Sequence, residues 1–215
     1  MSNSSSSGSA PDLSSIFSSS SMMAAAPEVP VWSAISAAAS CLRQGGVLAY
    51  PTEAVWGVGC DPFNPIAVAR LLRIKQRDPA KGVILIAGHQ RQLKPWLAPL
   101  EDEQRALLDD SWPGPHTWLV PDPERQAPTW IRGQHGSVAL RVTDHPLVVA
   151  LCEAFGGPIV STSANLAGQP SAMNLREAQR ALGDRPDGFL DGPTGGRTQP
   201  SQIRDLMSGD TVRAG

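Results

Sequence analysis

The sequence predicts an α/β fold in which helices cover a mixed sheet of parallel and antiparallel strands. Short apolar runs of strand length alternate along the chain with longer helical segments. The alternation is irregular, whereas a wholly parallel sheet needs a regular β-α-β series. Hydrophobic residues make up 41% of the 215 residues and charged residues 18%, so the chain holds enough apolar material for a core.

Helices are predicted where apolar residues recur with helical spacing between turn signals. Asn64 and Pro65 give the clearest start, because Asn caps a helix and Pro fits its first turn. Gly45 and Gly46 end the first helix. The predicted helices cover residues 32–44, 65–76, 101–110, 146–155 and 175–182.

Strands are predicted where short apolar runs are bounded by turn residues. Residues 82–87 are apolar throughout, which is typical of a strand buried on both faces. The predicted strands cover residues 47–50, 82–87, 116–120, 137–142, 158–161, 188–190, 202–206 and 211–213.

The first 29 residues are predicted to form a disordered tail, followed by one folded domain over residues 30–215. Residues 1–21 contain twelve serines, and Arg43 is the first basic residue. A secretory signal starts with positive charge and a transit peptide is rich in Arg, and neither pattern is present. We therefore expect a cytoplasmic protein with no membrane partner.

Composition disfavours several classes of site. Three widely spaced cysteines without a CxxC argue against a disulfide framework or a zinc site. The four histidines lack ligand spacing and are interpreted as surface or loop residues: His89, His116, His135 and His145. The phosphate-loop, dinucleotide and serine-nucleophile motifs are absent. A net charge of −2 disfavours a broad nucleic-acid-binding surface, although a local basic pocket is compatible with it.

Thr52 and Glu53 directly follow a predicted strand and precede two glycines in YPTEAVWGVG. Loops that leave strand ends are where α/β proteins place ligands, and Thr52 has a hydroxyl to offer one. A tight structural turn is the alternative interpretation.

A basic run surrounds the end of the second predicted helix. Five cations lie within twelve residues of an acidic chain: Arg70, Arg73, Lys75, Arg77 and Lys81. Such a cluster suits a polyphosphate, because guanidinium and ammonium groups match its oxygens. A solvated helix face with cations at its C-terminus is the alternative.

Ser163 and Asn165 follow another predicted strand, and their spacing places both side chains on one side of an extended segment. They suit phosphate oxygens or an adenine edge, or else a polar turn.

Arg141 lies within an apolar predicted strand, where a charge needs a partner. A bound carboxylate and a neighbouring Asp or Glu are equally good partners.

Together these segments resemble the YrdC-type family of threonylcarbamoyl-AMP synthases, in its short single-domain bacterial form. The resemblance spans about residues 33–215 and rests on YPTEAVWGVGCDP (50–62), RLLRIKQRDPAKGVILIA (70–87), SWPGPHTWLVP (111–121), VALRVTDHPLVVALC (138–152), IVSTSANLAGQP (159–170), PTGGRTQPSQIRD (193–205) and TVRAG (211–215).

The resemblance implies a YrdC-like fold, with a twisted mixed sheet and a basic concave cavity. It implies a nucleotidyltransferase that joins L-threonine, bicarbonate or CO2 and ATP into threonylcarbamoyl-AMP and releases pyrophosphate. The product is expected to serve formation of N6-threonylcarbamoyladenosine at position 37 of tRNAs that read codons starting with A. Mg2+ is expected on the triphosphate. The alternative functions are carbamoyl-phosphate-dependent adenylation, as in the YrdC-like domain of the much longer hydrogenase maturation proteins, and a non-enzymatic RNA-binding module.

The resemblance also assigns site residues. Those expected to bind ATP are Lys75, Arg77, Ser163, Asn165, Arg213 and Thr117. Those expected to bind threonine are Thr52, Arg141 and Ser201. Lys75 and Arg77 are the expected catalytic pair. The expected functional partners are the tRNA-modification proteins TsaB, TsaD and TsaE, with at most weak binding of tRNA itself. Loops or the N-terminal tail are expected to close the site.

Overall fold

The computed structural model describes residues 29–214. The predicted disordered tail, and with it any role of the tail in closing the site, lies outside these residues except for Val29. The strands are β1 (Val31–Trp32), β2 (Leu48–Pro51), β3 (Trp56–Gly59), β4 (Ile84–Ala87), β5 (His116–Pro121), β6 (Ser137–Val142), β7 (Ile159–Ser163), β8 (Gly188–Leu190), β9 (Gln202–Asp205) and β10 (Thr211–Arg213).

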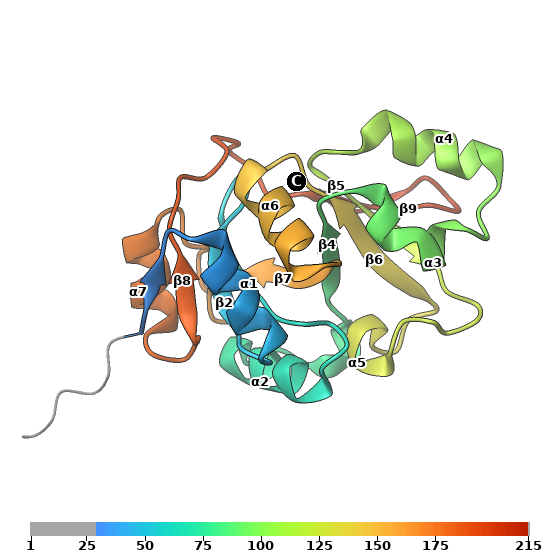
Figure 1. Ribbon diagram of the computed structural model, residues 1–215. Coiled ribbons are helices and arrows are strands. Elements are labelled where there is room, and N and C mark those ends of the chain that lie inside the picture. The colour runs from blue at the N-terminus through green and yellow to red at the C-terminus, as the bar shows by residue number, and fades with distance from the viewer. Residues whose placement is uncertain (1–28, 215) are drawn as a thin grey trace, which may run out of the picture.

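These ten strands form one sheet in the order β1-β8-β2-β3-β7-β4-β6-β5-β9-β10. Four neighbouring pairs are parallel: β1 with β8, β2 with β8, β4 with β6, and β5 with β9. The other five pairs are antiparallel. The predicted mixed α/β sheet with helical cover is therefore confirmed (Figure 1).

Helices lie on both sides of this sheet. They are α1 (Ile35–Arg43), α2 (Pro65–Lys75), α3 (Lys94–Leu97), α4 (Asp102–Ser111), α5 (Thr129–Arg132), α6 (Pro146–Phe155) and α7 (Leu175–Leu182), with 3-10 turns η2 (Pro79–Lys81) and η3 (Gln90–Leu93). α1 and α6 pack side by side over one face (Figure 1). Within the described residues, no helix has the length and apolar character needed to cross a membrane.

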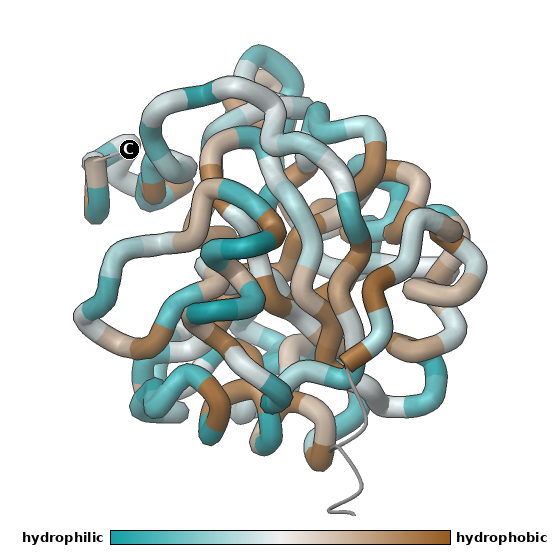
Figure 2. The backbone as a smooth tube through the Cα atoms, turned by 90° about the vertical axis from the view of Figure 1, so that its left-hand side faces the viewer, coloured by the Kyte–Doolittle hydropathy of each residue, from teal (hydrophilic) through white to brown (hydrophobic). Residues whose placement is uncertain are grey.

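The core consists of two clusters of buried side chains. Leu42 of α1 and Leu151 of α6 pack with Leu48 and Ile86 of the sheet in the smaller cluster. The larger cluster lies between the sheet and the remaining helices. Figure 2 shows brown, hydrophobic segments in the middle of the chain trace and at its edges, interspersed with teal, hydrophilic ones. Packing against these two clusters holds the strands in place, and with them the polar side chains at the strand ends.

One predicted helix is wrong in its bounds, and several observed elements were not predicted, β3 among them. Residues 32–44 are not one helix, because Trp32 pairs with Leu190 in the sheet and the helix begins only at Ile35. Residues 56–59, left outside the predicted strands, form β3 as a hairpin partner of β2. The interpretation of the histidines as surface or loop residues fails for His116, which lies in β5, whereas His145 lies in the loop before α6, although it is buried.

The chain around α2 has a well-defined start and end. Asn64 Oδ1 accepts hydrogen bonds from the amides of Ile66 (3.0 Å) and Ala67 (3.2 Å), which confirms the predicted cap. At the other end Gln76 adopts a left-handed conformation with φ of 51°, which stops the helix directly after Lys75. The chain therefore turns at Gln76, and Arg77 leaves the helix direction.

Candidate active site

A cavity of about 370 Å³ lies over one face of the sheet, lined by residues of seven strands and of the segments between them. Its charged lining is almost entirely basic: Arg77, Lys81, Arg132, Arg141, Arg197 and Arg213. Glu53 is the single acidic side chain among the described lining residues. A cavity with this balance of charge favours an anionic ligand.

Six of the nine predicted site residues line this cavity: Thr52, Arg77, Arg141, Ser163, Ser201 and Arg213. The other three, Lys75, Asn165 and Thr117, do not line it, but each forms a hydrogen bond with a residue that does. The structure thus brings together residues that are up to 161 positions apart in the sequence.

Lys75 holds the segment after β7 in place. Its ammonium donates to the main-chain oxygens of Ser163 and Asn165 (2.6 Å for Asn165) and to Asn165 Oδ1 (2.5 Å). Ser163 also donates its hydroxyl to Asn165 Oδ1, at 2.7 Å. A lysine has three N–H donors, so all of them are directed at this segment. Burial, together with the charge of Arg77, lowers the pKa of Lys75 to about 8.

Arg77 and Arg213 supply positive charge at the cavity wall. Arg77 donates through Nε (3.1 Å) and Nη2 (2.9 Å) to the main-chain oxygen of Gly82, and Arg213 donates to that of Ser201 at 2.7 Å. Burial lowers the pKa of both guanidinium groups, and for Arg213 the charges of Arg77 and Arg141 add to it. Both groups remain charged near neutral pH, because an arginine pKa starts far above it.

The basic run was interpreted either as a polyphosphate-binding cluster or as a solvated helix face, and its cations divide between these two roles. Arg70 forms an ion pair with Asp187, away from the cavity, and Arg73 is exposed. Arg77 and Lys81 line the cavity. The solvated-face interpretation is therefore correct for Arg73, and a polyphosphate can contact only the later part of the run.

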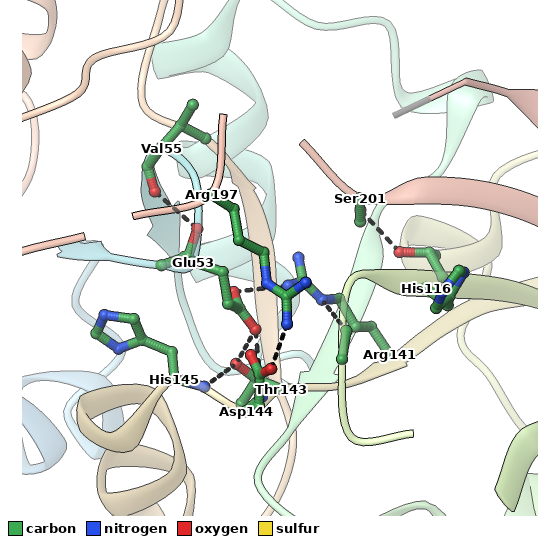
Figure 3. A network of polar contacts seen from close by, with 12 residues as sticks. Glu53, Val55, His116, Arg141, Thr143, Asp144, His145, Arg197 and Ser201 are labelled. Atoms are coloured by element: carbon green, nitrogen blue, oxygen red, sulfur yellow. Dashed lines mark hydrogen bonds and ion pairs between the residues drawn. The ribbon is translucent and has the colours of Figure 1, made fainter. Parts of the chain in front are cut away.

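Arg141 has a carboxylate partner within the protein. Its Nη2 lies 2.6 Å from Oε2 of Glu53, with both side chains buried, and its Nε donates to the Gly114 main-chain oxygen at 3.1 Å (Figure 3). Of the two partners considered from the sequence, the neighbouring Glu is thus present. Nη1 has no hydrogen-bond partner among residues 29–214, and the side chain also lines the cavity, so a ligand carboxylate can bind there as well.

Thr52 belongs to a tight turn and to the cavity wall at once. Its hydroxyl donates to the main-chain oxygen of Val55 at 2.7 Å, and its amide donates to the same oxygen at 3.0 Å. The turn interpretation is therefore correct. The oxygen of the hydroxyl still has acceptor capacity, so it can accept a hydrogen bond from a ligand amine.

Ser201 is oriented from behind by Thr117. The two hydroxyls lie 3.0 Å apart, Thr117 is fully buried, and Ser201 borders the cavity. Because Thr117 occupies one hydrogen-bonding position of Ser201, the remaining position is left to face a ligand.

Sequence reasoning assigned no role to Arg197, although the segment around it carries part of the resemblance and includes Ser201. Residues 191–201, here called the strap, connect β8 to β9, and Arg197, Gln199, Pro200 and Ser201 of the strap line the cavity. Arg197 pairs with Asp144 at 2.5 Å (Figure 3). The available signal was a cation in a Gly- and Pro-rich stretch, TGGRTQP, whose partner lies more than 50 residues away in the chain.

The fold has counterparts in known proteins. The sequence model of the Sua5, YciO and YrdC proteins, described as telomere recombination, matches residues 40–215. The chain belongs to the Sua5/YciO/YrdC family.

Relatives within the Sua5/YciO/YrdC family share most of the chain. The threonylcarbamoyl-AMP synthase of Chromohalobacter salexigens is 59% identical over 83% of this chain and 96% of its own. That of Cellvibrio japonicus is 56% identical over 83% of this chain and 94% of its own. The resemblance inferred from the motifs is thus confirmed at the level of the family.

A solved Sua5/YciO/YrdC structure has the same fold. The P. abyssi Sua5 protein complexed with L-threonine matches with a TM-score of 0.76 and 29% identity, over 82% of this chain. The matched region is 52% of the P. abyssi chain, so this chain spans about half of that protein's length.

Proposed function

We propose that the protein is a threonylcarbamoyl-AMP synthase, which joins L-threonine, bicarbonate or CO2 and ATP and releases pyrophosphate. The observation that carries this proposal is the 59% identity, over 83% of the chain, to a relative of that name. The gathering of the predicted residues at one basic cavity supports it, because ATP is an anion and threonine carries a carboxylate.

On the amino-acid side, Arg141 is proposed to bind the carboxylate of threonine. Ser201, held by Thr117, and Thr52 are proposed to bind its hydroxyl and amine. All three ligand-facing groups have a partner within the protein that limits their rotation. They are therefore oriented before the substrate arrives, which lowers the entropic cost of binding.

On the nucleotide side, Arg77 and Arg213 are proposed to offset the charge of the phosphates. Ser163 and Asn165, held by Lys75, are proposed to contact the adenylate part. Lys75 is therefore proposed to position residues 163–165 for the nucleotide, and its charge adds to the positive potential of the cavity.

The chemistry proposed needs no covalent intermediate with the protein. The amine of threonine attacks CO2 and releases a proton to water to give a carbamate; with bicarbonate as the carbon source, one water molecule is lost instead. A carbamate oxygen then attacks the α-phosphorus of ATP. The bond between the α-phosphorus and the bridging oxygen breaks, and pyrophosphate leaves. Catalysis then rests on positioning and on stabilisation of the developing charge by Arg77 and Arg213.

Mg2+ is proposed to accompany the triphosphate rather than to be held by a protein cage. Within residues 29–214 there is no group of three or more His, Cys, Asp or Glu side chains suited to a metal ion. Glu53, the acidic lining residue, is already paired with Arg141. Triphosphate oxygens and water are the ligands that Mg2+ accepts in such a site.

The product is proposed to supply formation of N6-threonylcarbamoyladenosine in tRNA, in the cytoplasm, with TsaB, TsaD and TsaE as functional partners. An adenylated carbamate is a reactive mixed anhydride, so an enzyme that consumes it promptly must follow. Weak binding of tRNA to the basic cavity is compatible with this role.

The test is pyrophosphate release from ATP with and without L-threonine and bicarbonate. We expect release that requires both, and that is much weaker with L-serine. Arg77→Ala is expected to lower kcat/KM by about 100-fold, since one charge-stabilising donor contributes that much. Arg73→Ala, an exposed arginine on the same part of the chain, is the matched control and is expected to have no effect. Release without threonine, or no release together with salt-sensitive tRNA binding, would contradict the proposal.

A further inference from the structure

The strap is attached to the loops that carry the amino-acid side of the cavity. The Gly195 amide donates to the Thr52 main-chain oxygen at 3.0 Å, and the Arg197 amide donates to that of Glu53, also at 3.0 Å. His145 Nε2 lies 3.1 Å from the main-chain oxygen of Pro193. A Cβ at position 195 would lie 3.0 Å from the Glu53 Cα, so the two segments are in close contact. The strap thus lies alongside the loop that holds Thr52 and Glu53, near the β8 end of the sheet in Figure 1.

The carboxylate of Glu53 contacts both Arg141 and the Thr143–Asp144 segment, to which the strap is attached. Its Oε2 pairs with Arg141, while its Oε1 accepts from the hydroxyl of Thr143 (2.6 Å) and from the amide of Asp144 (3.2 Å). Asp144 in turn pairs with Arg197 of the strap. One buried side chain therefore connects the proposed carboxylate anchor to the strap in two short steps (Figure 3).

We propose that Glu53 is a positioning residue that couples the binding of threonine at Arg141 to closure of the strap over the cavity. This inference rests on the proposed function, in that L-threonine is taken as the ligand of Arg141. Glu53 does not itself contact the reacting atoms. It fixes the direction of the Arg141 guanidinium, and it fixes the Thr143–Asp144 segment on which the strap is fastened.

The strap has few other attachments that would hold it closed. Most of its residues are exposed, and it is rich in Gly and Pro, so it buries little apolar surface of its own. The Asp144–Arg197 pair is itself half-exposed. Partial burial would raise the pKa of Asp144, but its hydrogen bond with Arg197 holds that pKa below the ordinary value. The strap therefore depends on a few polar contacts, and Glu53 organises the side-chain contact among them, the Asp144–Arg197 pair.

The test compares Glu53→Gln with Glu153→Gln. Glu153 is also a carboxylate paired with an arginine, Arg91 at 3.0 Å, but on the exposed surface, so it is a matched control. We expect Glu53→Gln to raise KM for L-threonine at least tenfold while KM for ATP changes less than twofold. Amide hydrogen exchange at residues 195–197 is expected to become about tenfold faster. Equal changes in both KM values, a lower KM for threonine, or unchanged exchange would overturn the proposal.

Arg197→Gln provides a second variant, because its side chain is partly exposed and its loss should not prevent folding. In the unsubstituted protein, saturating L-threonine is expected to slow exchange at residues 195–197, and in Arg197→Gln this protection is expected to be largely lost. Absence of protection in the unsubstituted protein, measured where calorimetry shows threonine bound, would overturn the coupling. If calorimetry shows no threonine binding, the proposed function fails instead. Amide hydrogen exchange at residues 195–197 of Glu53→Gln, measured without ligand, then still tests whether Glu53 holds the strap: faster exchange supports this role and unchanged exchange overturns it.

Discussion

Replacing Arg141 by Met should strongly destabilise the fold, and replacing Glu53 by Gln in the same chain should restore much of the loss. The two side chains are 10% and 3% exposed, with 2.6 Å between Nη2 and Oε2. Arg141→Met leaves the carboxylate of Glu53 buried without its counter-charge, and such a change costs about 3–5 kcal/mol. The double variant has no buried charge at this pair, and the amide introduced by Glu53→Gln keeps an oxygen for the Thr143 hydroxyl. The double variant should therefore be less destabilised than the sum of the singles by about 2 kcal/mol or more.

Urea denaturation followed by tryptophan fluorescence measures these free energies of unfolding for the two single variants and the double variant. Equal m-values across the set are required for the comparison. Arg91→Met is the control, because its pair with Glu153 is 69% and 47% exposed and should be worth less than about 1 kcal/mol. Additive effects to within about 0.5 kcal/mol, or a loss below about 1 kcal/mol for Arg141→Met, would refute the reasoning from burial.

Three further predictions concern the supports of the site. The rate of pyrophosphate release should fall as pH rises through about 8, the pKa of Lys75, because deprotonation removes the charge that holds residues 163–165; Lys75→Arg, which stays charged, should move this limb of the pH–rate profile upward, and an unmoved limb would assign it to another group. Thr117→Val should raise KM for L-threonine by about tenfold, which corresponds to about 1.4 kcal/mol for the hydrogen bond lost by Ser201, and unchanged kinetics would show that Ser201 needs no such support. Asn64→Ala should lower the free energy of unfolding by about 1 kcal/mol in chemical denaturation, since two amides lose their cap; no change would mean that water replaces it.

The elements that sequence analysis predicts well are those whose signals are local. The start of α2 at Asn64 and Pro65 depends on a cap and a proline within one turn, and the structure confirms it. β3 was missed because WGVG is short and half glycine, so it has little strand propensity of its own. It is held by β2 and β7 on either side, and that pairing is not written in its own residues.

The site shows the same division between local and distant information. The motif segments identify which residues gather at the cavity, and six of the nine line it. They do not reveal that Lys75 directs its donors at the protein itself, nor which carboxylate pairs with Arg141. Arg141 and Glu53 are 88 positions apart in the sequence, and only the order of the strands in the sheet brings the two side chains close enough to form an ion pair. The role of Arg197 was missed for the same reason.

The strand order also has a consequence for how the chain is made. β8 lies between β1 and β2, and β7 lies between β3 and β4. Strands that are synthesised early therefore lack a pairing partner until strands near the C-terminus have been synthesised. As the chain leaves the ribosome, the β2–β3 hairpin keeps open edges until residue 190 has emerged, and the cavity lacks a wall until residue 213 has emerged. Pairings of such long sequence separation also slow folding. A partly synthesised chain therefore has no complete site and exposes strand edges that can pair with other chains.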